Sequence, residues 1–386
     1  MPKSPRKRKL DALLSMGRSE GMLQAELGKE ETARQSNRFT FSMTPKELYA
    51  FLGRFLIGQE EAQQKVANAV CYHYQHLAMP GQKPRSTHKN NVLLIGPTGC
   101  GKTYIAQKLA QAVKVPLLIS DATRFSAAGY VGDKVESLVQ DLVIKAKGDL
   151  SSASRGIIYL DEIDKIAARE TCGRDVSGRD VQGGLLKIIE GGSEIKVTLP
   201  TGERLIKTDD ILFIGGGAFS DLYKHLRNAS TANPRKRTEG EDGDFLYSAD
   251  MPGLLKALQK YGMIPELLGR IPVIARLQSL SQGDLRRILT DSEESVLRQY
   301  EQDFAAYGIT VAFDPSAYDA LAERAYARGM GARGLGAVAE EALTPLKFHL
   351  PGTGITEALV TAETIQKPTE TTLRLIQDHK TKLGGD

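Results

Sequence analysis

Eight residues, Gly96–Thr103, have the types and spacing of a phosphate-binding loop. They read GPTGCGKT, which fits G-x-x-x-x-G-K-[ST], and stand between the apolar run NVLLI and the helical pattern TYIAQKLAQAV. Backbone N–H groups of such a loop surround phosphates at a helix N-terminus. Lys102 would reach the β- and γ-phosphates, and Thr103 would ligate Mg²⁺. The nucleotide-binding residues predicted in this loop are Gly96, Pro97, Thr98, Gly99, Cys100, Gly101, Lys102 and Thr103.

Two carboxylates follow another apolar run, GIIYLDEID at 156–164, in the position of a Walker B strand. Asp161 would hold Mg²⁺, directly or through water, and Glu162 would polarise the attacking water. An isolated Asp-Glu pair is commonly a solvated strand end, but its place after a phosphate loop favours catalysis. Asp164 and Lys165 are expected to be structural surface residues.

Two arginines could complete a catalytic set. Arg270, in GMIPELLGRIP, follows a short helix at the edge of the domain, where it could reach a neighbouring subunit's γ-phosphate. Arg333, in GMGARGLGAVAEEAL, begins a later helix and could cover the nucleotide of its own subunit. Taken alone, each arginine is more often a partner in a surface ion pair.

The elements that must position these residues alternate between strands and helices. Five apolar runs, NVLLIG, PLLIS, GIIYLDE, ILFIGGG and IPVIARL, are separated by helical patterns. This alternation predicts an α/β fold with a parallel five-stranded sheet flanked by helices. After about Ser279 the patterns are mainly helical. We therefore predict a basic arm over 1–43, a large α/β domain over 44–278 and a smaller helical domain with a polar tail over 279–386.

Composition limits the class of protein. Hydrophobic residues make up 41% of the 386 residues, which is enough for two cores. The net charge of +4 is already present in residues 1–40, which hold nine Lys/Arg and five Asp/Glu, so the remainder is neutral. A nucleic-acid partner is therefore not expected. No apolar run of membrane length occurs, and the three cysteines form no CxxC pair. We expect a cytoplasmic protein that has no membrane anchor and no zinc.

The stretch AAGYVGDKVE, residues 127–136, places Tyr130 and Val131 between two glycines. By itself such a stretch is most often a turn whose aromatic tip folds back onto the domain.

Eight segments together resemble the ClpX family of AAA+ protein unfoldases. They occur in the family's order: FLIGQEEA, GPTGCGKT, GYVGDKVE, YLDEIDKIAAR, RDVSGRDVQGGLLKIIEGG, FIGGGAF, GMIPELLGRIPV and GARGL. The resemblance extends from about Thr44 to about Pro351. The related HslU is the second choice, but HslU carries a long inserted domain for which this chain has no room.

The resemblance implies a homo-hexamer that uses ATP and Mg²⁺ to thread polypeptide substrates. Tyr130 and Val131 match the pore loop that grips the substrate, and residues 171–180 match a second pore loop. Ile57 and Gly58 match the segment that packs on adenine. Glu162, Arg270 and Arg333 match the family's catalytic glutamate, its arginine finger and its second-domain arginine.

Three departures from the family pattern affect the expected function. Residues 1–43 contain no cysteine, so the N-terminal zinc domain is missing. The segment after GGGAF lacks the apolar tripeptide that docks to the peptidase ClpP, and DFLY at 244–247 is a poor substitute. The pore-entrance loop is replaced by the shorter LPTGERLIKTDD. The sequence therefore predicts an unfoldase that acts without ClpP. The alternatives are an ATPase that docks a peptidase through an unfamiliar loop, and an AAA+ nucleic-acid motor or loader.

Overall fold

This computed structural model describes residues 39–79, 89–125, 133–168, 176–229 and 249–383. Contacts divide the chain into two units, one of Met1–Ser42 with Tyr74–Gln82 and one of Met43–His73 with Lys83–Asp386. In the first unit, the rings of Phe39 and Phe41 lie 5.8 and 5.9 Å from that of Tyr74. The second unit contains everything that forms the candidate site. The two units are not the two domains predicted from the sequence. The domain boundary expected between residues 278 and 279 therefore stays a prediction.

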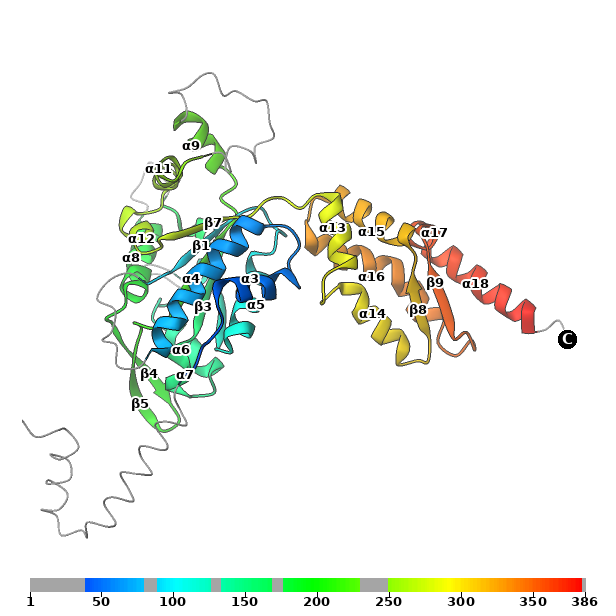
Figure 1. Cartoon of the computed structure of the whole chain (residues 1–386), viewed down its shortest axis with the longest axis horizontal. Helices are drawn as coiled ribbons and strands as arrows, with labels where there is room; N and C mark the ends of the chain where they lie inside the picture. Colours follow the sequence, from blue (N-terminus) through cyan, green and yellow to red (C-terminus); the bar gives the residue numbers. More distant parts are fainter. Residues whose placement is uncertain (1–38, 80–88, 126–132, 169–175, 230–248, 384–386) are drawn as a thin grey trace, which may run out of the picture. The chain divides into compact units, whose positions relative to one another are not determined.

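A five-stranded parallel sheet carries the first part of the second unit (Figure 1). Its strand order is β2-β3-β6-β1-β7, and every pairing is parallel. The bounds are β1 (Val92–Ile95), β2 (Leu117–Asp121), β3 (Ile157–Asp161), β6 (Leu212–Gly217) and β7 (Val273–Arg276). All five strands coincide with the apolar runs, so the predicted α/β fold is confirmed.

Helices complete this α/β region (Figure 1). They are α3 (Pro45–Gly53), α4 (Glu60–Ala78), α5 (Lys102–Val113), η1 (Ala122–Arg124), α6 (Ser137–Lys145), α7 (Leu150–Ala153), η2 (Ile163–Ile166), α8 (Val176–Glu190), α9 (Leu222–Ala229), α11 (Met251–Tyr261) and α12 (Pro265–Gly269). One buried cluster joins all five strands to α6, α8, α9, α11 and α12. Thr44 caps the start of α3, since its side chain and that of Glu47 form a reciprocal capping box.

An antiparallel hairpin, β4 (Glu194–Leu199) and β5 (Gly202–Lys207), was not predicted. The segment LPTGERLIKTDD contains its turn and β5. Ion pairs join its strands, Lys196 to Glu203 at 2.5 Å and Lys207 to Glu194 at 3.6 Å. The exposed faces are charged, so the alternation of apolar residues that would identify a strand is weak here.

The C-terminal region is mainly helical, as the sequence predicts. It consists of α13 (Gln282–Thr290), α14 (Val296–Ala305), β8 (Thr310–Phe313), α15 (Pro315–Ala327), α16 (Ala332–His349), β9 (Glu357–Val360), α17 (Ala362–Gln366) and α18 (Pro368–Leu383). A second buried cluster contains residues from each of the helices α13, α14, α15, α16 and α17 and from both strands, β8 and β9. β8 and β9 form a short parallel pair that we did not predict.

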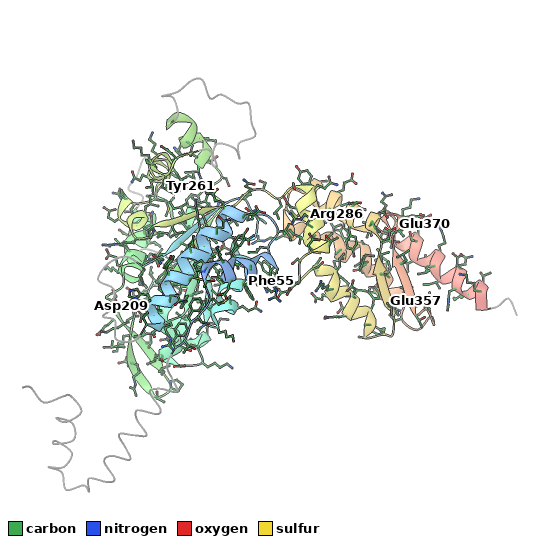
Figure 2. All side chains as sticks on the ribbon, viewed as in Figure 1. Phe55, Asp209, Tyr261, Arg286, Glu357 and Glu370 are labelled. Carbon is green, nitrogen blue, oxygen red and sulfur yellow. The ribbon has the colours of Figure 1, made fainter. Side chains whose placement is uncertain are left out.

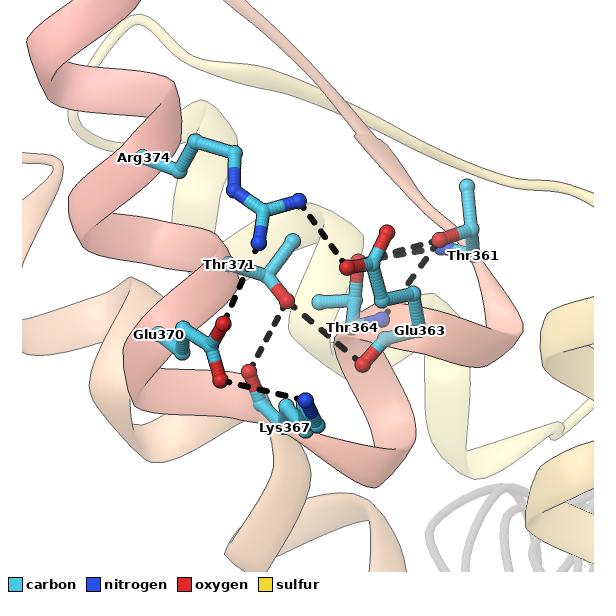
Figure 3. Close-up of polar contacts among 7 residues, drawn as sticks. All are labelled: Thr361, Glu363, Thr364, Lys367, Glu370, Thr371 and Arg374. Atoms are coloured by element: carbon cyan, nitrogen blue, oxygen red, sulfur yellow. Dashed lines mark hydrogen bonds and ion pairs between the residues drawn. The ribbon is translucent and has the colours of Figure 1, made fainter.

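Polar contacts tie α18 to α17 (Figure 3). Arg374 donates hydrogen bonds to Glu363 at 2.9 Å and to Glu370 at 3.1 Å. The Thr371 hydroxyl donates to the carbonyl oxygen of Lys367 at 2.8 Å. These contacts anchor the start of α18, which occupies most of the segment predicted as a polar tail.

Asn91 is a buried polar residue that holds several elements together just before β1. It is 1% exposed. Its Oδ1 accepts a hydrogen bond from the backbone N–H of Phe213 at 3.1 Å, and its Nδ2 donates to the carbonyl oxygen of Arg270 at 2.8 Å. Nδ2 also lies 3.4 Å from the carbonyl oxygen of Ile189. The one side chain therefore joins β6, the end of α12 and the end of α8.

We predict that Asn91→Ala lowers the free energy of unfolding by about 1–3 kcal/mol, because buried backbone groups lose their partner. Urea denaturation of the nucleotide-free protein at fixed concentration measures the change. Asn90→Ala is the matched control, since the half-buried Asn90 makes a single bond, to the carbonyl oxygen of Ala69 at 3.2 Å. Equal losses for the two variants would contradict this account.

Candidate active site

The phosphate loop joins β1 to α5, which is the strand-loop-helix setting that the motif requires. At two of its glycines, neighbouring backbone lies too close to leave room for a side chain. A Cβ on Gly96 would lie 2.4 Å from the carbonyl oxygen of Leu277, and one on Gly99 would lie 2.1 Å from that of Met330. Gly99 also has a left-handed φ of 79°. Any side chain at either position would displace the loop.

Lys102 begins α5 and curls back over the loop. Its Nζ donates to the carbonyl oxygens of Gly96 at 2.7 Å and Pro97 at 2.8 Å, and the residue is 9% exposed. The ammonium charge is therefore held at the loop, where the motif places it. The neighbouring Cys100 is buried, and burial raises the pKa of its thiol.

Thr103 and Asp161 lie together although 58 positions separate them in the chain. Thr103 Oγ1 donates to Asp161 Oδ2 at 3.0 Å. Asp161 ends β3, and its Oδ1 accepts the backbone N–H of Glu162 at 3.0 Å. A hydroxyl and a carboxylate are hard oxygen donors of the type that Mg²⁺ prefers, so this pair fits the predicted ion.

Glu162 stands at a sharp turn. Its φ is +54°, an uncommon left-handed conformation for a residue with a side chain, and η2 begins immediately after it. The turn leaves the Glu162 side chain exposed. Such local strain is characteristic of functional sites.

One cavity of about 510 Å³ brings these side chains together. Its lining includes Lys102, Thr103, Asp161, Glu162 and Arg333. Arg333 lies in the first turn of α16, so this arginine reaches the cavity from the C-terminal region. Two positively charged side chains, Lys102 and Arg333, thus line the same cavity as two carboxylates, a composition suited to a phosphate chain with a bound cation.

A second cavity, of about 330 Å³ and more apolar, shares Gly101, Tyr104 and Arg333 with the first. Ile57 lines it beside Phe55 and Leu56. This is the position expected of a pocket for the nucleotide base. The neighbouring Gly58 has a φ of 69°, and its carbonyl oxygen accepts a hydrogen bond from Gln63 Nε2 at 2.5 Å.

Residues 292–294 hold the C-terminal region against α3 and α5 beside the apolar cavity. Arg54 pairs with Glu293 at 2.6 Å, and Tyr104 donates to Glu294 at 2.9 Å. Lys108 also bonds Glu294, and its Nζ lies 4.2 Å from the ring centre of Phe55, which is labelled in Figure 2. The hydrogen bond from Lys108 lowers the pKa of Glu294. None of these contacts was predicted.

Asp164 corrects an expectation: it is 4% exposed and not a surface residue. Its carboxylate accepts the backbone N–H groups of Ala218 at 3.2 Å and Phe219 at 3.3 Å. Phe219 has a φ of +48°, so Asp164 holds a strained turn after β6. Lys165 is exposed, as expected.

Arg270 lies away from the cavity, at the opposite end of β1. Its backbone carbonyl is bound by Asn91, which precedes β1, whereas the phosphate loop follows β1. At about 3.3 Å per residue, Asn91 and Gly96 are separated by roughly 16 Å. The guanidinium pairs with Glu190 through Nε at 2.8 Å and Nη2 at 2.6 Å. The structure therefore does not bring Arg270 to the nucleotide site of its own chain.

Several predicted residues lie outside the described part of the chain. These are Tyr130, Val131, the first half of the 171–180 segment and DFLY at 244–247.

Sequence reasoning missed Tyr159 and Glu190. Tyr159 is the polar residue in the apolar run IIYL, and a hydroxyl in a buried strand needs a partner. Glu190 ends α8, where a negative charge is unfavourable to the helix dipole. The sequence thus indicates that each of these two side chains needs a partner, but it does not identify the residue that provides it.

Within the described ranges, no helix is long and apolar enough to cross a bilayer. Those ranges also contain no cluster of three or more His, Cys, Asp or Glu side chains able to hold a metal ion. The expected absence of zinc stays a prediction.

Comparison with protein-family models assigns both regions. Residues 87–274 match the AAA domain (Cdc48 subfamily), and residues 280–348 match the C-terminal, D2-small domain of ClpB protein.

Curated relatives cover most of the chain. The "ATP-dependent Clp protease ATP-binding subunit ClpX" of Borrelia duttonii (strain Ly) is 40% identical over 343 residues, covering 83% of this chain and 78% of that protein. The protein of the same name from Borrelia recurrentis (strain A1) has the same identity and coverage. "ClpX 2" of Wolinella succinogenes is 37% identical over 336 residues, covering 84% and 82%. The chain therefore belongs to the ClpX family of AAA+ ATPases.

Proposed function

We propose that this ATPase is a protein unfoldase that threads polypeptides through the pore of a homo-hexamer. The observation that carries the proposal is the cavity in which Lys102, Thr103, Asp161, Glu162 and Arg333 meet. A binding module that used ATP only for assembly would have no need of the Glu162 carboxylate beside the Mg²⁺ pair. Because the chain resembles ClpX proteins over most of its length, we expect its substrate to be a polypeptide.

In this mechanism each side chain has a separate task. Thr103 and Asp161 would hold Mg²⁺, which when bound neutralises charge on phosphate oxygens. Lys102 places a positive charge at the loop, and Glu162, exposed at its turn, accepts a proton from the attacking water. Arg333 closes the cavity from the C-terminal region. Ile57 contributes an apolar wall for the base.

Arg270 would act on the nucleotide of a neighbouring subunit. The separation of roughly 16 Å along β1 argues against action in its own subunit. Glu190 engages the Nε and Nη2 side of the guanidinium, so Nη1 lies outside the pair. The ion pair is about two-fifths exposed on both sides, and such pairs contribute only about 0–1 kcal/mol. A phosphate would therefore compete easily for Arg270. This requirement for a neighbour supports an oligomer, and the number of six subunits rests on the resemblance to the ClpX family.

Substrate contact and peptidase independence rest on the sequence. Tyr130 and Val131 match a pore loop that can grip any polypeptide, because a flat ring and a branched side chain make unspecific contacts. The relatives' printed names make those proteins subunits of the Clp protease. This chain lacks a recognisable docking tripeptide between residues 220 and 261. We infer that it remodels proteins without passing them to ClpP.

We predict that Glu162→Gln still binds ATP but hydrolyses it about 10²–10⁴-fold more slowly, because only the proton acceptor is lost. Lys102→Ala should instead weaken nucleotide binding itself. Single-turnover hydrolysis and equilibrium binding of labelled ATP separate the two effects. Turnover of Glu162→Gln within a few-fold of wild type would exclude this carboxylate as the base.

We predict that Arg270→Ala hexamers are inactive and that mixing them with Glu162→Gln subunits restores some hydrolysis. In the mixture, an intact Arg270 can face an intact Glu162, and an arginine finger is worth roughly 10³–10⁵ in rate. Steady-state ATPase assays on mixtures, with co-assembly verified by labelled subunits, provide the measurement. A mixture as inactive as its components would show that Arg270 does not act in trans.

We predict that Tyr130→Ala raises the number of ATP molecules consumed per substrate unfolded at least severalfold, because the loop slips on the polypeptide. Unfolding of a tagged fluorescent protein, followed together with ATP hydrolysis, measures this ratio. Single-stranded DNA in place of the protein substrate tests the nucleic-acid alternative.

We predict that adding purified ClpP to the wild-type protein, ATP and a protein substrate produces no proteolysis. ATP-dependent degradation that is lost on deleting residues 245–247 would establish peptidase docking instead.

A further inference from the structure

Tyr159 lies directly beneath the predicted Mg²⁺ ligands. It is the third residue of β3 and is 0% exposed. Side chains of a strand alternate between faces, so Tyr159 and Asp161 point to the same side of the sheet. The Tyr159 hydroxyl donates to Asp161 Oδ1 at 3.2 Å and lies 3.4 Å from Thr103 Oγ1, whose own proton is donated to Asp161 Oδ2. Both described partners of this hydroxyl belong to the Mg²⁺ pair.

These contacts fix the orientation of the Asp161 carboxylate. Oδ1 accepts from the Tyr159 hydroxyl and from the backbone N–H of Glu162, whereas Oδ2 accepts from Thr103. Without the phenol, Oδ1 would keep only the backbone bond next to it, and that bond does not prevent the carboxylate from rotating. Tyr159 thus holds Oδ1 from the side opposite to Thr103, so that Oδ2 stays turned towards the phosphate loop.

The neighbouring strand leaves space for this hydroxyl. A Cβ built on Gly216 of β6 would lie 2.1 Å from the Tyr159 hydroxyl oxygen and 2.7 Å from Cζ. The position therefore accepts no side chain while Tyr159 is in place. Burying a hydroxyl among aliphatic residues is unfavourable unless the hydroxyl is bonded, so packing alone would be better served by phenylalanine.

We propose that Tyr159 is a positioning residue that orients Asp161 and Thr103 for binding Mg²⁺ together with the nucleotide. The proposal rests on the role assigned above to Thr103 and Asp161. Partners that orient metal ligands commonly change metal affinity about 10–100-fold when they are removed.

The test measures metal binding without hydrolysis. A fluorescent ADP analogue is titrated in EDTA and then over a range of Mg²⁺ concentrations, with wild type and Tyr159→Phe. We expect the half-saturating Mg²⁺ concentration to rise about tenfold in the variant, while affinity in EDTA changes less than about twofold. A half-saturating concentration within twofold of wild type would overturn the proposal.

Two further variants control the result. Gly216→Ala displaces the hydroxyl from the side of β6 and should raise the half-saturating Mg²⁺ concentration in the same direction. Tyr300→Phe removes a comparable bond, from a buried tyrosine to Glu340 in the C-terminal region, and should leave Mg²⁺ dependence unchanged. A rise in Tyr300→Phe equal to that in Tyr159→Phe would mean that lost stability, not positioning, causes the effect, and would also refute the proposal.

Asp161→Asn separates failure of this inference from failure of the proposed site. If Asp161→Asn weakens Mg²⁺ binding and Tyr159→Phe does not, only the positioning role is wrong. If neither variant changes Mg²⁺ dependence, Thr103 and Asp161 are not the metal pair, and the proposed site itself fails.

Discussion

The active site depends on one constraint, which is that the start of α5 must reach the end of β3 across an intervening strand. β6 lies between β1 and β3, so the two strand ends stand about 10 Å apart. The contact between Thr103 and Asp161 at 3.0 Å closes this distance. β6 ends in three glycines, and a side chain at Gly216 would occupy the place of the Tyr159 hydroxyl. A strand without side chains at this end therefore permits carboxylates, hydroxyls and the phosphate loop to meet.

Much of this site was predictable because its parts are local in sequence. The phosphate loop, the two carboxylates after β3 and the five apolar strands each lie within a short stretch with a characteristic composition. Asp164 was misjudged because its burial depends on the turn at Ala218 and Phe219, about 54 residues away. The hairpin of β4 and β5 was missed because it is stabilised by charged pairs on exposed faces. Neither contact leaves a periodic signal.

The contacts of polar residues with distant parts of the chain could not be predicted from the sequence either. Asn91 and Glu190 are ordinary residues in the sequence, yet together they hold the backbone and the guanidinium of Arg270. Asn91 is fully buried, whereas the pair of Glu190 and Arg270 is half-exposed. Breaking the buried hydrogen bond between Asn91 and the Arg270 carbonyl therefore costs more free energy than breaking the exposed ion pair between Arg270 and Glu190. If Arg270 acts on a neighbouring subunit as proposed, it would do so from a firmly held backbone and with a side chain that can change its partner at little cost.

A similar contrast applies to the contacts that surround the nucleotide cavities. Arg333 reaches the phosphate side from α16, and Glu294 reaches the apolar side from the segment before α14. Lys108 is almost fully buried beside aromatic rings, so leaving its ammonium without Glu294 would be unfavourable, although the Glu294 side chain itself is about half-exposed. By contrast, Arg333 is exposed, so a phosphate would be its strongest partner. The apolar side of the site is thus held by an ion pair within the chain, whereas Arg333 on the phosphate side is open to a ligand.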